Sequence, residues 1–413
     1  MLRKDLKILN VVITIFVTIL VLYYLISVGY YLNNYPFMKD DSNCIIAQFV
    51  QYFLEGNLSE KLNFFVAVTN WPHPKISLRV MTILDYYLTG EINFIHIKLF
   101  TMLGFTGFSS LLYFLSNSKN KLLVVFPALI VILTPNISNH WAVLFSVPYT
   151  AIFIILSFYF IYRNKVGLGI LFSVLVSFNT FEGFIVFALA IAFYLLLNVK
   201  KLKLKKVRLD ISLLLFFFVI VCFLVKHFIF DVQTLDSRLS ADVSSFSMVD
   251  YYSIFENFWN FSFMILRQTY NLGTFLFMVL VLGLSLIATI NVYRSYREGN
   301  NNPLVFYLTF IYYLGFGLIL SVHKFEENLD VYYINSRFNL NSFFTLALLL
   351  YLLLYRIKNV RKLLLGSFLF SILMIPLHFV SHEKLANKIY NGFVQKRAIG
   401  EMIKAKKAMR KTK

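Results

Sequence analysis

The feature that most constrains this chain is a series of long apolar runs separated by short basic segments. An apolar run of about 18 residues or more is long enough to cross a lipid bilayer as a helix. Runs of this kind recur from Ile8 to Val380, and 59% of the residues are hydrophobic whereas only 14% are charged. Soluble domains carry about 25% charged residues. We therefore predict an all-α integral membrane protein.

The basic residues indicate which ends of the runs face the cytoplasm. Lys and Arg concentrate in the cytoplasmic loops of membrane proteins, and here each basic patch follows two apolar runs after the previous patch. This regularity predicts roughly eleven transmembrane helices, with the N-terminus in the cytoplasm and residues 1–380 as the transmembrane domain. The expected spans are 8–32, 94–115, 122–133, 142–162, two within 166–199, 211–230, 272–292, 304–321, 340–355 and 363–380.

Charge and cysteine content exclude other classes of protein. The formal net charge is +19, but the basic residues form short patches between apolar runs, which does not indicate nucleic-acid binding. The two cysteines, Cys44 and Cys222, are too few for a disulfide framework. The first apolar run is too long for a signal peptide and no small-residue cleavage site follows it, so we expect an uncleaved membrane anchor.

The apolar stretch 166–199 has a polar interruption in its middle. It is too long for one crossing, it breaks at Ser177–Gly183 (SFNTFEG), and both of its flanks are basic. Two short spans that meet outside satisfy the bias of basic residues toward the cytoplasm, whereas one span does not. Glu182 in this break faces either a cavity or water, because a carboxylate is costly when it faces lipid.

The long first extracytoplasmic loop, 33–93, holds most of the residues that could carry chemistry. Asp40 and Asp41 lie just beyond the outer end of the first span. One interpretation is that they cap the following helix, 43–54, since acidic residues near a helix N-terminus are stabilising. The other is that one of them is a general base, because a partly desolvated carboxylate beside a second one has a raised pKa.

Further along the same loop, His73 lies between two prolines and is followed by Lys75 and Arg79. We predict a helix over 76–88 with an apolar stripe, lying in the membrane interface with its N-terminus toward His73. A helix N-terminus combined with Lys and Arg forms an anion site. The alternative is a surface helix whose basic residues contact lipid phosphates.

Later segments add fewer candidates. A second exterior loop is expected at 231–261, with Asp231 and Asp236 among its acidic residues. Arg337 enters the tenth span from the exterior side, where it pairs with a phosphate or with a nearby acidic residue. The tail, 381–413, is basic, and its helically spaced apolar residues predict an amphipathic helix on an anionic surface.

These motifs together resemble those of the bacterial GT-C-type glycosyltransferases, which use polyprenyl-phosphate-linked sugars as donors. The resemblance consists of the acidic residues at the start of the first loop (KDD), the stretch HPKISLRVMTILDYYLTGEINF, the SFNTFEG break and the pair SRFN at a late span entrance. It covers most of the chain as an architecture, although each motif is short.

The resemblance implies roles for residues of this chain. Asp40 or Asp41 is expected as the catalytic base, and the lipid phosphate and substrate are expected at His73, Lys75, Arg79, Glu182 and Arg337. A second acidic motif that some members carry has no clear counterpart here. Whether a divalent metal, Mg or Mn, takes part is therefore left open.

The function predicted from the sequence is transfer of a sugar from a polyprenyl-phosphate donor to a cell-surface glycan or lipid-linked acceptor. We expect the chain in a bacterial inner membrane, with membrane lipid, the lipid-linked donor and a glycan acceptor as its partners and no nucleic acid. One alternative is an O-antigen polymerase or ligase, which is expected to centre on a late exterior loop with paired arginines. Another alternative, which is not an enzyme, is a flippase or transporter of lipid-linked glycans.

Overall fold

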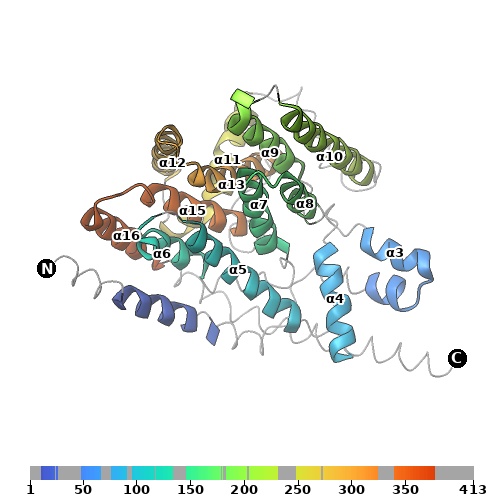
Figure 1. Cartoon of the computed structure of the whole chain (residues 1–413). Coiled ribbons are helices and arrows are strands. Elements are labelled where there is room, and N and C mark those ends of the chain that lie inside the picture. Colours follow the sequence, from blue (N-terminus) through green and yellow to red (C-terminus); the bar gives the residue numbers. More distant parts are fainter. Residues whose placement is uncertain are drawn as a thin grey trace.

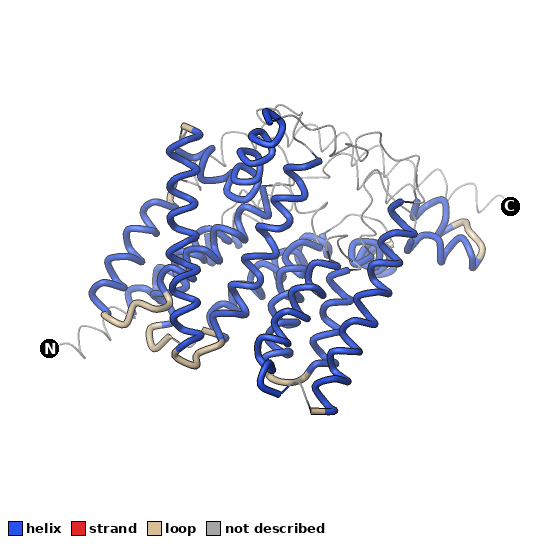
Figure 2. The backbone as a smooth tube through the Cα atoms, turned by 90° about the horizontal axis from the view of Figure 1, so that it is seen from above, coloured by secondary structure: helices blue, strands red, loops and turns tan. Residues whose placement is uncertain are grey.

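The computed structural model describes residues 11–23, 25–26, 48–66, 76–90, 95–116, 118–133, 146–177, 179, 183–201, 204–230, 248–270, 273–323 and 339–376. The fold is all-helical, with 90% helix, and no strand occurs within these residues (Figure 2). The all-α class predicted from the sequence is therefore confirmed for the part of the chain that the structure describes.

The helices follow one another with short connections. A first helix spans Val11–Tyr23. The later elements are η1 (Phe49–Leu54), α3 (Leu58–Val66), α4 (Ile76–Thr89), α5 (Ile95–Leu115), α6 (Lys121–Ile132), α7 (Ser146–Tyr162), α8 (Val166–Ser177), α9 (Gly183–Asn198), η3 (Val199–Lys201), α10 (Lys205–Phe230), α11 (Met248–Tyr270), α12 (Thr274–Arg297), α13 (Asn302–His323), α15 (Asn339–Leu354) and α16 (Val360–Met374). Almost every apolar run of the sequence thus corresponds to one helix.

Polar residues form the turns between these helices. Asn164, between α7 and α8, has φ 56°, and Gly299, between α12 and α13, has φ 80°. This left-handed conformation ends a helix and is adopted most easily by Gly and Asn. Asn359 begins α16, because its side chain accepts hydrogen bonds from the backbone N–H groups of Arg361 and Lys362. Such capping satisfies donors that have no partner inside the helix.

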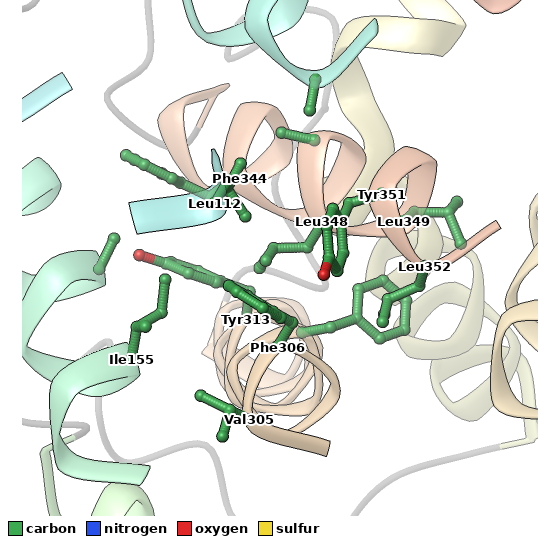
Figure 3. Packing of buried hydrophobic residues seen from close by; sticks show 14 of the residues in the cluster. Leu112, Ile155, Val305, Phe306, Tyr313, Phe344, Leu348, Leu349, Tyr351 and Leu352 are labelled. Atoms are coloured by element: carbon green, nitrogen blue, oxygen red, sulfur yellow. The ribbon is translucent and has the colours of Figure 1, made fainter. Parts of the chain in front are cut away.

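The core lies around α15, which packs against α6, α11, α12 and α13. Every residue from Phe343 to Leu354 is buried. Figure 3 shows α13 and α15 facing one another, with Tyr313 beside Phe344. The two rings stack with their centroids 5.4 Å apart. A helix that is apolar on all sides is expected at the centre of a bundle or in a membrane.

The basic residues gather at one end of the bundle, which we call the basic end. There the end of α5 meets the start of α13, since Asn302 Nδ2 donates to the Leu115 carbonyl at 3.4 Å. The ends of α12 and α15 also meet, since the Tyr355 hydroxyl donates to the Asn291 carbonyl at 2.7 Å. The described cations at this end are Lys119, Lys121, Arg163, Lys165, Lys201, Lys205, Lys206, Arg208, Arg294, Arg297, Arg356, Lys358, Arg361 and Lys362.

At the other end, which we call the opposite end, α5, α7, α9 and α12 begin, and α8, α13 and α16 end. The Tyr149 hydroxyl of α7 donates to the Phe100 carbonyl near the start of α5, at 2.7 Å. The Tyr270 hydroxyl of α11 donates to the Leu373 carbonyl at the end of α16. The bundle thus has two ends of different charge, because few of the described cations lie at this one.

Two of the described helices are long and apolar enough to cross a membrane, Thr274–Arg297 and Asn302–Ile319. Shorter apolar helices are Val11–Tyr23, Leu99–Leu115, Lys121–Ile132, Pro148–Tyr162, Val166–Ser177, Gly183–Asn198 and Ser342–Leu354. The number of crossings derived from the sequence stays a prediction.

The interruption expected at Ser177–Gly183 is present, because α8 ends at Ser177 and α9 begins at Gly183. The two helices pack closely at this point. A Cβ on Gly183 would lie 2.4 Å from the Ser177 Cα, so only glycine fits there. The start of α9 in turn approaches α13, where Gly315 lies near Ile185.

The second exterior loop differs from the sequence-based prediction. A loop was expected over 231–261, whereas residues from Met248 onward form α11, which continues to Tyr270. Residues 231–247, including Asp231 and Asp236, lie outside the described residues. α11 packs against α13 and α15, because apolar residues such as Trp259 and Phe263 alternate with its polar ones and are buried.

Candidate functional site

The structure describes only one of the site residues predicted from the sequence. Arg79 lies on α4, whereas the other predicted site residues lie outside the described residues: Asp40, Asp41, His73, Lys75, Glu182 and Arg337. The basic tail, 381–413, also lies outside them. The roles proposed for these residues therefore stay predictions.

α4 has the predicted extent, Ile76–Thr89 instead of 76–88, and it packs against α3, η1 and α5. In Figure 1, α3 and α4 lie together at one side of the molecule, far from α12 and α16. The first loop of the sequence thus contributes a separate group of short helices that borders the start of α5.

Arg79 is completely buried. Its Nη1 donates to the Phe64 carbonyl in the last turn of α3, and its guanidinium lies 5.0 Å from the centroid of the Phe64 ring. The last four carbonyls of a helix have no partner within the helix, so an Arg that reaches them fixes how the next element packs. Arg79 therefore connects α4 to the end of α3.

Burial also changes the acid–base properties of Arg79. Desolvation lowers the pKa of its guanidinium from 12.5 to about 10, because a charged group is disfavoured away from water. Since this pKa is still far above 7, Arg79 keeps its positive charge at neutral pH. Any phosphate that reached this charge would form a charge-assisted hydrogen bond.

The two faces of α4 are inverted relative to those of a helix on a soluble protein. The polar side chains Arg79, Thr82 and Asp85 are completely buried. The apolar side chains on the other face are exposed, by 43% at Leu84 and 68% at Tyr87. A helix with this arrangement has its apolar face available for contact with lipid.

A second group of polar residues lies at the opposite end, between α11 and α12. We call it the α11–α12 cluster, and it consists of Glu256, Asn260, Arg267 and Thr274. Arg267 Nη1 donates to Asn260 Oδ1 at 2.6 Å, and Arg267 Nη2 donates to the Thr274 hydroxyl oxygen at 2.8 Å. Glu256 Oε1 accepts from the Thr274 hydroxyl at 3.1 Å and from Arg267 Nη1 at 3.4 Å.

A bend in α11 makes these contacts. Phe263 has φ −138° and ψ 27°, which are not helical, so the helix bends there. Glu256 and Arg267 are eleven residues apart, which would separate their Cα atoms by about 16 Å in a straight helix. The bend shortens this distance, and Arg267 reaches both Asn260 and Glu256.

α13 has two glycines where it passes α11 and α9. A Cβ on Gly317 would lie 2.4 Å from the Ser262 hydroxyl oxygen of α11. A Cβ on Gly315 would lie 3.9 Å from its nearest neighbour, Ile185 of α9. The close approach of α11 to α13 therefore depends on Gly317, and it holds the α11–α12 cluster against the core.

The part of the chain that the structure describes contains no group of three or more His, Cys, Asp or Glu residues that could hold a metal ion. This does not test whether the proposed reaction uses Mg or Mn, because the acidic residues of the first loop lie outside the described residues.

The sequence-based reading did not identify Arg267 or Asn260 as site residues. Both lie in a segment, NFWNFSFMILRQTY, that alternates polar and aromatic residues without a clear period. The one signal was an arginine close to the outer end of a predicted span, where a charge needs a partner. Its partners could not be identified, because they depend on the bend at Phe263.

We compared the chain with models of protein families, with curated proteins and with solved structures, and none of them matches.

Proposed function

We propose that this chain is a multi-span membrane glycosyltransferase. It would transfer a sugar from a polyprenyl-phosphate donor to a cell-surface glycan or a lipid-linked acceptor, on the outer face of a bacterial inner membrane. In this proposal most of the helices cross the bilayer, roughly eleven in all, with the basic end in the cytoplasm and the opposite end outside.

The exposed apolar side chains support a membrane location. Eight residues of α12 expose large apolar side chains along its length: Phe275, Leu276, Val279, Leu280, Leu282, Leu286, Ile287 and Ile290. Soluble monomers rarely expose a continuous apolar surface of more than a few hundred Å². Lipid would cover this surface in the proposed arrangement.

The distribution of charge supports the proposed orientation. Each contact between helix ends described above joins two ends to which the sequence pattern assigns the same side of the membrane. The described cations accumulate at the basic end, as expected of loops that remain in the cytoplasm. The first extracytoplasmic loop then lies outside, together with α4 and the α11–α12 cluster.

The single observation that carries the enzymatic part of the proposal is the inverted helix α4. Its apolar face is exposed at Leu84 and Tyr87, while its buried face carries the charged Arg79. A helix of this kind rests on the membrane surface with a cation on its protein-facing side. This is the arrangement needed to bring the phosphate of a lipid-linked donor to protein side chains.

The proposed reaction needs a base and cations. Asp40 or Asp41 would take the proton from the acceptor hydroxyl, whose oxygen then attacks the anomeric carbon of the sugar. The bond from that carbon to the phosphate oxygen breaks with inversion, and polyprenyl phosphate leaves with the bonding electrons. His73, Lys75, Arg79 and Arg337 would stabilise the leaving phosphate, and Glu182 would bind the substrate.

The test uses membrane vesicles from a strain that lacks the chain and is complemented with variants. The glycan that is lost in the deletion strain identifies the product, and its formation from the polyprenyl-phosphate sugar is then measured. Asp40→Asn or Asp41→Asn should abolish transfer in at least one case, with the protein still present in the membrane. Glu298→Gln at the basic end is the matched control. Normal transfer by both aspartate variants would show that neither is the base.

A further inference from the structure

The α11–α12 cluster contains a buried donor without a partner. Asn260 is completely buried, and its Nδ2 makes no hydrogen bond. The orientation of this amide follows from the contact with Arg267, because a guanidinium only donates, so the atom facing it must be the acceptor Oδ1. Nδ2 shares its carbon with Oδ1 and thus lies beside the guanidinium. An unsatisfied buried donor costs about 1–3 kcal/mol and indicates a missing acceptor.

The start of α12 adds further donors at the same place. Its N-cap is Gly273, which provides no side-chain hydrogen bond, so the first backbone N–H groups of the helix lack a cap. These groups carry the positive end of the helix dipole and favour an anion. The Thr274 hydroxyl and the Arg267 guanidinium lie next to them, 2.8 Å apart. A missing acceptor with a negative charge fits all of these groups.

Glu256 now occupies this place in part. Its carboxylate contacts Arg267 at 3.4 Å, which is long for a charge-assisted hydrogen bond, and Thr274 at 3.1 Å. Its side chain remains 25% exposed, so it lies at the edge of the cluster and does not fill it. Glu256 therefore acts as an internal anion that a stronger one could displace.

The surroundings indicate which anion could arrive. Tyr251, Tyr252 and Phe255, on the turns of α11 before Glu256, are each at least 50% exposed. Exposed aromatic residues at this level of a membrane protein lie among lipid headgroups. An anion that reaches Arg267 from that side is the phosphate of a lipid.

We propose that the α11–α12 cluster is a phosphate-binding site for a lipid headgroup, and that the carboxylate of Glu256 competes with the phosphate for Arg267 and the start of α12. The choice of a lipid rests on the membrane location in the proposed function. The phosphate chemistry does not depend on glycosyl transfer, and the site differs from the predicted one at His73–Arg79.

The test is equilibrium binding to the purified full-length chain in a neutral detergent. The probes are a short-chain phosphatidic acid and inorganic phosphate, and Glu256→Gln is compared with the wild type. Removing the competing carboxylate should tighten binding about tenfold, which corresponds to about 1.4 kcal/mol for one partly screened charge interaction. Tighter binding of phosphatidic acid than of phosphate identifies a lipid source, and equal binding identifies a soluble phosphate and overturns the lipid assignment.

Arg267→Gln should abolish saturable binding, whereas Arg297→Gln removes the same charge from the other end of α12 and should leave it unchanged. If Arg267→Gln does not fold, the comparison of Glu256→Gln with the wild type still decides. The proposal is overturned if Glu256→Gln binds no more tightly than the wild type, or if Arg297→Gln weakens binding as much as Arg267→Gln does. Asp40→Asn should bind normally, so a failure of the transfer reaction and a failure of this site give different results.

Discussion

Replacing Gly183 with alanine tests the close packing at the break between α8 and α9. The added Cβ would lie 2.4 Å from the Ser177 Cα and 2.7 Å from the Ser177 backbone nitrogen. Ordinary contacts begin at 3.4 Å, so the two backbones must part by about 1 Å, that is 3.4 − 2.4. No side chain can rotate to relieve this contact, because the nearest atoms belong to the backbone.

The expected cost is that of overpacking, about 1–3 kcal/mol, reduced by less than about 1 kcal/mol because alanine favours helix more than glycine does. We therefore expect Gly183→Ala to lower the free energy of unfolding by about 2 kcal/mol. The measurement is reversible unfolding of the purified full-length chain in mixed detergent micelles, followed by circular dichroism. Movement at this break should also reduce transfer activity, because the predicted substrate residue Glu182 precedes Gly183.

Gly167→Ala is the matched control, because Gly167 lies in the first turn of α8 and a Cβ there meets nothing within 4 Å. This variant should be as stable as the wild type or slightly more stable. If Gly183→Ala and Gly167→Ala unfold together, α8 and α9 do not pack as closely as described, and the reasoning about the break is refuted.

Two other substitutions test α4 and its surroundings. Arg79→Met should destabilise the protein by about 2 kcal/mol in the same unfolding assay, because a charge-assisted hydrogen bond and a cation–π contact are lost, whereas the exposed Arg163→Met should change stability by less than about 0.5 kcal/mol; equal effects would contradict the connection between α4 and α3. A spin label on Tyr87→Cys, with Cys44 and Cys222 replaced by serine, should be more accessible to oxygen than to a water-soluble nickel complex in nanodiscs. A label on Lys358→Cys at the basic end should show the reverse order, and identical behaviour of the two labels would argue against lipid contact at α4.

Much of the fold follows from the sequence because its signals are local. The break at Ser177–Gly183 was predicted from the length of the apolar run and its polar middle, and the structure ends α8 and begins α9 at those two residues. α4 was predicted to within one residue at its end, because its apolar stripe has a helical period.

The site is less predictable because it depends on long-range packing. Arg79 was expected to bind phosphate, and its contact with Phe64 requires the positions of both α3 and α4. The α11–α12 cluster depends on a bend at Phe263, where neither proline nor glycine marks it in the sequence. Glu256 was read as a loop residue, since its helix mixes polar and aromatic side chains.

The position of α15 has a consequence for how the protein is made. This helix is completely enclosed by α6, α11, α12 and α13, yet it is one of the last helices to be synthesised. Until Asn339–Leu354 has left the ribosome and entered the bundle, the earlier helices lack the surface on which they pack. Domains usually fold in the order of synthesis, and incomplete ones expose surfaces that aggregate. We therefore expect a truncated chain that ends before α15 to be degraded, although it would retain most of its helices.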